Sequence, residues 1–317
     1  SGKEYSAVFQ FSGIGGNLRY FSPFVAYKSF RSMHYLKPSP NGHNVLGLRA
    51  QLGYIQGFGG DVAPPQNRFY AGGEGELRGF DVRGATPYGY VPNRVTVQLT
   101  NPDGTCVPRD PNNPQLNQCI QVPLPIYGIA SIGGDTQLTT NMEYRIPIAG
   151  PVMFSFFDDF GITTALNKGQ LKQSPEGFDS LTAPLYGCPV YNNGSCQGGI
   201  SGSQVGFLRD IRPVSGTNFV PRMSLGAEIS VIMPVVNAPF RLYYAYNPLR
   251  LYERPFCNNV LSPGINQSCS AQLITRDLFP PGGAGDFTYQ EALQGYGARN
   301  LFREPRKTFR LTVSTTF

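Results

Sequence analysis

Cysteine and histidine are the residues of this sequence with the widest chemical range, and their spacing limits what they do. The six cysteines fall into three couples that are close in sequence: Cys106 and Cys119, Cys188 and Cys196, Cys257 and Cys269. None of these couples has the CxxC or Cys/His spacing of a metal site, and the two histidines, His34 and His43, lie elsewhere in the chain. We therefore expect no metal ion.

Each cysteine couple lies in its own polar stretch rich in Pro, Gly and Asn. Other pairings are possible on paper, but separate loops favour three local disulfides. Disulfides in loops indicate an oxidising, extracytoplasmic compartment. For catalysis, the sequence shows no Gly-x-Ser-x-Gly elbow with a plausible triad, so a hydrolase is disfavoured. We expect no enzyme activity and no cofactor.

A second chemically suggestive stretch is RFYAGGEGELRGFDVRG, residues 68–84, where Arg78 stands between Leu77 and Gly79-Phe80. Glycines, among them Gly72 and Gly73, allow the backbone to turn sharply and to approach another surface closely. A guanidinium confined in such a place needs a carboxylate that takes it bidentately. The alternative is an ordinary exposed loop arginine.

The composition limits the class of protein. The chain has 317 residues, 22 Phe, 18 Tyr and no Trp, and 15% of its residues are charged, against about 25% in soluble domains. The net charge of +6 is spread without a basic run, so we expect no nucleic-acid partner. No apolar run approaches the roughly 20 residues of a membrane helix. The first residues lack the features of a signal peptide, which suggests a piece of a longer protein or a mature segment.

The segments that must position these residues alternate with period two, as strands do. Many have ten residues or more, whereas globular strands usually have about 5 or 6 and a strand crossing a bilayer at a tilt needs about 9–11. About eight such strands are predicted, at residues 5–11, 18–30, 45–57, 137–148, 152–166, 222–235, 240–252 and 308–317.

Alternation alone fits both a soluble β-sandwich and a transmembrane barrel. In residues 137–148, for example, Leu138 and Met142 oppose Glu143, and Asp159 falls on the polar face of the next strand. The connections favour the barrel, because outer-membrane barrels have short turns on one side and long loops on the other. All three cysteine couples fall in the long ones. From the third connection onward, long and short alternate: 58–134, 147–151, 167–217, 234–239 and 253–303.

Several motifs then resemble one family in the right order. FYAGGEGELRGF (69–80) is similar to the signature loop of the BamA superfamily of outer-membrane assembly and translocation barrels. SFFDDFG (155–161) resembles an aromatic-x-Asp-x-Gly strand of that family, and FRLTVSTTF (309–317) resembles its last strand. The resemblance implies that the loop at 58–134 folds into the barrel lumen. Its motif would be Gly72, Gly73, Leu77, Arg78, Gly79 and Phe80.

In that family the loop arginine meets acidic residues on the inner wall. By parity, the matching partners of Arg78 here are Glu143 and Asp159, which would otherwise be plain lumen-lining acids. Family barrels have sixteen strands, and eight closed alone would leave no room for an inserted loop. The resemblance therefore implies a transmembrane antiparallel β-barrel domain over residues 1–317, of which this is the carboxyl-terminal half. An autonomous eight-stranded form is the alternative.

The resemblance also implies a function and a location, the bacterial cell outer membrane. The expected activity is folding and insertion of outer-membrane proteins through a lateral seam at the last strand, with Phe309, Leu311, Val313 and Phe317 on one face. Expected partners are outer-membrane lipids, nascent outer-membrane proteins, periplasmic chaperones and accessory lipoproteins. The alternatives are a translocation barrel, of the two-partner secretion or translocation and assembly module type, and a passive porin or receptor.

Overall fold

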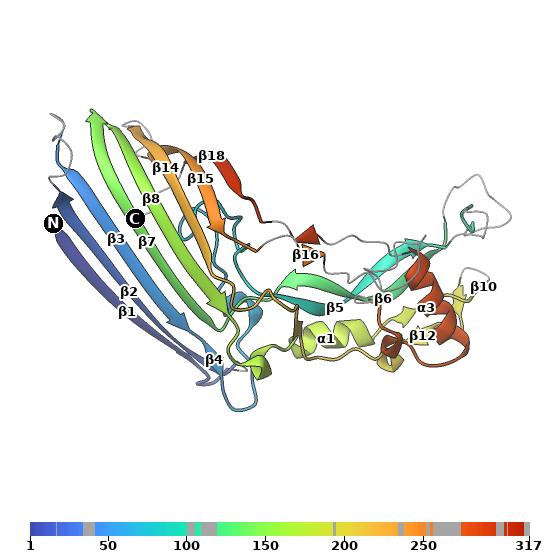
Figure 1. Cartoon of the computed structure of the whole chain (residues 1–317). Coiled ribbons are helices and arrows are strands. Elements are labelled where there is room, and N and C mark those ends of the chain that lie inside the picture. Colours follow the sequence, from blue (N-terminus) through green and yellow to red (C-terminus); the bar gives the residue numbers. More distant parts are fainter. Residues whose placement is uncertain are drawn as a thin grey trace.

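The computed structural model describes residues 1–16, 18–33, 42–99, 105–108, 119–192, 195–233, 238–251, 254–255, 274–295, 301–302 and 304–313. Its main element is one antiparallel sheet of long strands (Figure 1). In spatial order these strands are β1 (Gly2–Ser12), β2 (Tyr20–Met33), β3 (Asn44–Tyr54), β7 (Thr136–Ala149), β8 (Val152–Thr164), β14 (Arg222–Met233), β15 (Ala238–Leu249) and β18 (Lys307–Val313). The short β4 (Gln56–Gly57) pairs with the start of β2.

The sheet is open within the described residues, with β1 at one edge and β18 at the other. All neighbouring long strands are antiparallel, and their order in the sheet is the same as their order in the sequence. Each long connection therefore ends beside the strand from which it started. The predicted antiparallel, mainly β architecture is confirmed, whereas closure into a barrel stays a prediction.

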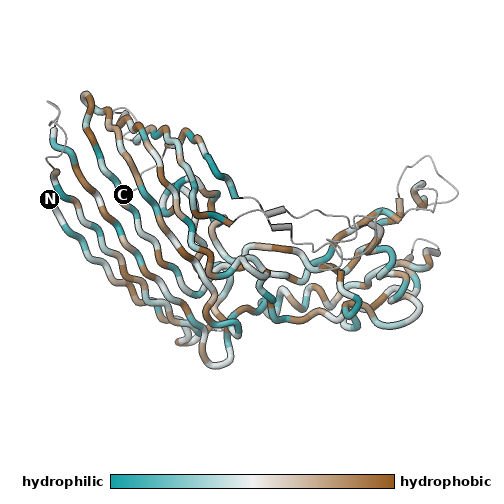
Figure 2. The backbone as a smooth tube through the Cα atoms, in the orientation of Figure 1, coloured by the Kyte–Doolittle hydropathy of each residue, from teal (hydrophilic) through white to brown (hydrophobic). Residues whose placement is uncertain are grey.

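The two faces of the sheet are reversed relative to a soluble protein. On β7, the polar Thr139 and Glu143 are buried, while the apolar Met142 is 46% exposed. On β18, the apolar Leu311 is 68% exposed. Figure 2 shows the matching alternation of hydrophilic and hydrophobic residues along the strands. Buried polar and exposed apolar rows are what a lipid-facing sheet requires. We call the apolar side the outer face: Tyr5, Phe9, Phe11, Val25, Leu48, Leu52, Leu138, Met142, Phe156, Leu225, Ile229, Leu242, Tyr244, Phe309, Leu311 and Val313.

Three long connections, 55–135, 165–221 and 250–306, leave the same end of the sheet (Figure 1). Apart from residues 69–85, their described residues pack together, and we call this part the lobe. A small sheet joins two of these connections: β13, from the second, pairs with β5 of the β5–β6 hairpin in the first. The elements of the lobe are β5 (Tyr88–Gln98), β6 (Gln121–Ser131), α1 (Pro175–Thr182), β9 (Leu185–Tyr186), β10 (Val190–Asn192), β11 (Ser195–Gln197), β12 (Ile200–Ser201), β13 (Arg212–Pro213), β16 (Arg254–Pro255), α3 (Gly283–Gly295), β17 (Leu301–Phe302) and the 3-10 turns Pro65–Asn67, Lys168–Gln170, Gly202–Gln204 and Arg276–Leu278.

The lobe has an apolar core of its own. Leu124 of β6, Tyr186 of β9, Phe207 and Leu278 are all buried in one cluster that also includes Ala292 of α3. These residues come from all three connections, so the lobe is one packed unit rather than three separate loops. No helix among the described residues is long and apolar enough to cross a membrane.

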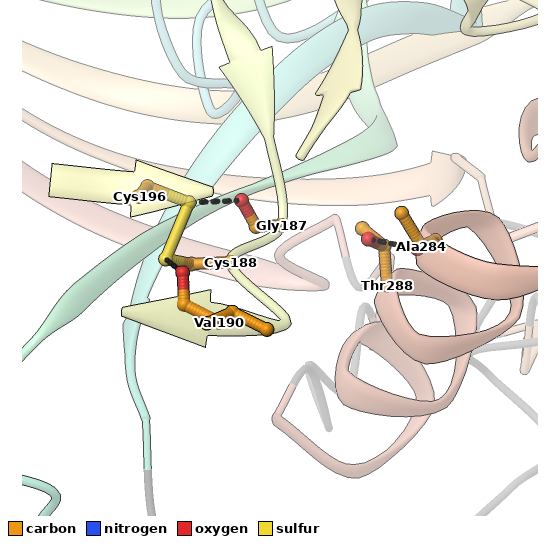
Figure 3. Close-up of a disulfide and its surroundings, with 6 residues drawn as sticks. All are labelled: Gly187, Cys188, Val190, Cys196, Ala284 and Thr288. Carbon is orange, nitrogen blue, oxygen red and sulfur yellow. Dashed lines mark hydrogen bonds between the residues drawn. A yellow bond between two sulfur atoms is a disulfide. The ribbon is translucent and has the colours of Figure 1, made fainter. Parts of the chain in front are cut away.

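Two of the three local disulfides lie within the described residues. Cys106 bonds to Cys119 and Cys188 bonds to Cys196, with Cα–Cα distances of 5.6 and 5.3 Å. Figure 3 shows the second bond, with Gly187 between it and Thr288 of α3. The third predicted couple, Cys257 and Cys269, lies outside the described residues, as does Phe317.

Within its described residues the lobe contains two helices, α1 and α3, that the period-two pattern did not predict. A local signal for α1 is nevertheless present, because Ser174 caps the helix by accepting a hydrogen bond from the Gly177 amide at 3.1 Å. Pro175 and Glu176 follow in the first turn, as helix starts favour. The range predicted as one long loop, 58–134, likewise contains the β5–β6 hairpin.

Candidate functional site

The glycine-rich stretch folds as a compact hairpin against the buried polar face of the sheet, which we call the inner wall. Bridges between Ala71 and Ala85 and between Gly73 and Leu77 close it, and Leu77 and Phe80 are fully buried. Gly72 and Gly73 both have positive φ, a conformation that glycine adopts without a Cβ clash. We call residues 69–85 the RGF hairpin. Its fold directs Arg78 onto the inner wall.

Arg78 binds the inner wall through every part of its polar head. Its Nε and Nη2 donate to the two oxygens of Asp159 at 2.8 Å each, a bidentate pair. The Arg78 backbone amide also donates to Asp159, at 3.0 Å. Nη1 lies 3.3 Å from Glu143 and 3.4 Å from Glu228. Arg78 therefore contacts both acids that the parity argument assigned to it, and a third acid that was not assigned.

One flat face of the Arg78 guanidinium is covered by an aromatic ring. Its Cζ lies 3.8 Å from the centre of the Phe157 ring on β8, a cation–π geometry. The ring lies over Gly226 of β14, where an added Cβ would come within 2.3 Å of it. Gly226 thus leaves the space in which Phe157 lies flat beneath Arg78. The aromatic-x-Asp-x-Gly motif is read on this face as Phe157, Asp159 and Gly161.

The acids around Arg78 are shared with two further arginines of the inner wall. Arg145 Nε donates to Glu143 at 3.1 Å, and Arg241 Nε donates to Glu228 at 2.7 Å. The cluster thus has three guanidinium groups and three carboxylates: Arg78, Arg145 and Arg241 with Glu143, Asp159 and Glu228. Its formal charge is therefore balanced, which a buried group of ions requires.

Sequence reasoning missed Glu228 and Arg241 as members of this cluster. Both lie on the polar face of their strands, and the alternation in residues 222–235 already predicts that face for Glu228. Parity does not give the height along a neighbouring strand, and Glu228 reaches Arg78 only because β14 pairs with β8 in the observed register. Asn141, also missed, donates to Asp159 at 2.9 Å and to the Glu76 carbonyl at 2.6 Å.

Electrostatics keep Arg78 charged. Burial lowers the pKa of its guanidinium, but the attraction of Asp159, and then of Glu143 and Glu228, outweighs burial. The net effect raises the pKa of Arg78 above the ordinary arginine value. The cation that holds the RGF hairpin in place is therefore present at every physiological pH.

The RGF hairpin also contacts the edge strand β18. The Gly79 carbonyl accepts from Asn247 Nδ2 at 2.9 Å and from Thr308 Oγ1 at 2.8 Å. Two residues further on, Asp81 forms an ion pair with Arg310 of β18. At the other end of the hairpin, Arg49 Nη1 of β3 donates to the Gly75 carbonyl at 2.8 Å, so the hairpin spans the inner wall from β3 to β18. The predicted edge residues Phe309, Leu311 and Val313 lie on the opposite, outer face.

The arrangement is built to hold a segment in place. Its carboxylates and guanidinium groups form ion pairs with each other. In the described residues no group of three or more His, Cys, Asp and Glu side chains is placed to hold a metal ion. The geometry provides a set of contacts that link the RGF hairpin to six strands: β3, β7, β8, β14, β15 and β18. These contacts hold the RGF hairpin against the inner wall. We call the hairpin, held in this way, the brace.

Comparisons with known proteins identify the family of this chain. Residues 5–255 match the Omp85 superfamily domain. Among solved structures, BamA from Haemophilus ducreyi lacking POTRA domains 1–3 is similar at 17% sequence identity and a TM-score of 0.44. That alignment covers 78% of this chain and 35% of the BamA chain, so this chain spans about a third of that protein's length. Because the family match extends over most of the sequence, the chain belongs to the Omp85 superfamily.

Proposed function

We propose that this chain forms part of a β-barrel of the bacterial outer membrane that folds and inserts other outer-membrane proteins. Membership of the Omp85 superfamily supports an outer-membrane location and a role in insertion or translocation of polypeptides. The observation that carries the proposal is the RGF hairpin. It is fixed on the inner wall by Arg78 and Asp159 and also contacts β18 through Gly79 and Thr308.

In the proposed mechanism, β18 is the side of the barrel that opens to the client. Unpaired backbone groups are costly at membrane depth, so an open strand edge favours pairing with an incoming strand by β-augmentation. Within the described residues, β18 pairs with β15 along one side and has no neighbouring strand along the other. The brace would keep the inner wall in register while the edge exchanges partners.

This mechanism needs no cofactor and breaks no covalent bond. The proposed partners follow from it: membrane lipids on the outer face, an unfolded outer-membrane protein at β18, and the periplasmic chaperones and accessory lipoproteins that deliver such clients. A passive porin would need no hairpin bound to Glu143 and Asp159, and the observed contacts favour insertion over that alternative.

The membrane orientation predicts unequal effects of one substitution at two exposed leucines. Leu48 lies mid-strand on the outer face of β3 and Leu208 lies in the lobe, with 39% and 52% of their surfaces exposed. Leu48→Arg is expected to cost about 2–4 kcal/mol of folding stability in a bilayer, the cost of arginine at the lipid midplane. Leu208→Arg is expected to change it by less than about 0.5 kcal/mol, as surface substitutions do. Urea unfolding in lipid vesicles measures both, and equal effects would contradict a lipid-facing β3.

The function is tested by reconstituting the native protein that contains this chain into lipid vesicles. A urea-unfolded outer-membrane barrel is then added, and its folding is followed by the heat-dependent shift in gel migration. Insertion activity predicts faster client folding than in vesicles without the protein. Protection of a soluble polypeptide inside the vesicles, with no gain in client folding, would instead identify a translocation barrel. Ion conductance alone would identify a passive pore.

A further inference from the structure

A second buried ion pair, separate from the Arg78 cluster, lies where the sheet meets the lobe. Arg222, the first residue of β14, is fully buried, and Glu304, just before β18, is nearly so. Arg222 Nη2 and Nε lie 3.0 and 3.2 Å from the same Glu304 oxygen. We call Arg222 and Glu304 the rim pair. The residues are 82 positions apart in sequence, and neither was assigned a partner from sequence.

The remaining polar atoms of the rim pair bind three other segments. Arg222 Nη1 donates to the Val220 carbonyl at 2.8 Å. Its Nη2 donates to the carbonyl of Thr86, the residue directly after the RGF hairpin, at 3.5 Å. The other Glu304 oxygen accepts the backbone amide of Leu251. The pair therefore joins β14, the RGF hairpin and both ends of the connection between β15 and β18.

The residues that follow Glu304 are held to the same neighbours. Asn247 of β15 donates from its backbone amide to the Arg306 carbonyl at 2.9 Å, and from Nδ2 to the Pro305 carbonyl at 2.8 Å. The same Nδ2 donates to the Gly79 carbonyl at 2.9 Å. Asn247 and the rim pair thus fix the short segment through which the chain passes from the lobe into β18.

We infer that the rim pair is a latch that positions the start of β18 against β14 and the RGF hairpin. A buried salt bridge of this kind contributes little net stability compared with apolar residues, but removing one partner leaves an isolated charge. We therefore expect the rim pair to fix the position at which β18 begins, with little contribution to net stability. If β18 is the mobile side of the seam, as proposed above, the latch sets how readily that side opens. The latch itself does not depend on that proposal.

Hydrogen exchange measured by mass spectrometry tests the latch on the full-length protein folded in lipid nanodiscs. Arg222→Lys keeps the charge but loses the planar fork, and Glu304→Gln loses the charge. Each is expected to raise exchange in residues 304–313 by about tenfold or more, because hydrogen bonds to charged groups limit local opening. Exchange in β7 and β8 is expected to stay unchanged. Lys172→Gln, which removes a cation from an exposed pair with Asp210, is the control and is expected to leave all of these segments unchanged.

The double variant decides between a latch and two independent residues. Because Arg222 acts through Glu304, the double variant is expected to exchange no faster in residues 304–313 than the faster single variant. An additive effect, unchanged exchange in both single variants, or an equal increase across β7 and β8 would overturn the inference. Since exchange is measured without a client, these outcomes stand whether or not insertion activity is found.

Discussion

Replacing Arg78 with alanine is expected to cost about 3–5 kcal/mol of folding stability, the cost of removing one partner of a buried ion pair, and to abolish client insertion. The substitution removes both hydrogen bonds of the bidentate pair with Asp159 and the contacts to Glu143 and Glu228. Three buried carboxylates would then face only Arg145 and Arg241. Urea unfolding and heat-dependent gel migration measure the loss of stability, and the vesicle assay measures insertion.

Arg83 provides a matched control, because it is an exposed arginine in the same hairpin whose guanidinium lies 5.2 Å from the Tyr70 ring. Arg83→Ala is expected to change stability by less than about 0.5 kcal/mol. The double variant Arg78→Met/Asp159→Leu removes both charges and is expected to regain stability but not insertion. Similar behaviour of the Arg78→Ala and Arg83→Ala variants would rule out the brace.

The second large effect is expected at Gly79. Its φ is +90°, and an added Cβ would lie 2.5 Å from Asn247 Oδ1 and 2.9 Å from both Ala245 Cβ and Ser224 Oγ. Gly79→Ala therefore combines backbone strain, of order 1–3 kcal/mol, with overpacking of about 1–3 kcal/mol. The Gly79 carbonyl should also lose its alignment with Thr308. Urea midpoints measure the first effect, and hydrogen exchange of β18 measures the second.

Gly75 lies in the same hairpin and has no atom within 4 Å of an added Cβ. Its φ is also not in the positive range. Gly75→Ala is therefore expected to leave stability within about 0.5 kcal/mol of the parent. If alanine is tolerated equally at both positions, the close approach of the hairpin to β15 is not maintained in the membrane.

The lobe shows where sequence reasoning was limited. Period two identifies each long strand, because one side chain in two faces each side of a sheet. The lobe core has no comparable period: Leu124, Phe207 and Leu278 come from three connections and meet only in the folded chain. The α1 helix was predictable in principle, since Ser174, Pro175 and Glu176 form a local start signal.

The sequence by itself determined the long alternating strands and the side of the sheet on which Glu143 and Asp159 lie. It also paired the two cysteine couples within the described residues, Cys106–Cys119 and Cys188–Cys196. These features are local, because strand parity and turn composition are set by neighbouring residues. Only the tertiary structure decided that Glu228 and Arg241 complete the Arg78 cluster and that Arg222 meets Glu304. Such contacts depend on the register between strands and on the path of each long connection. Contacts between residues far apart in sequence produce no periodic pattern from which they could be predicted.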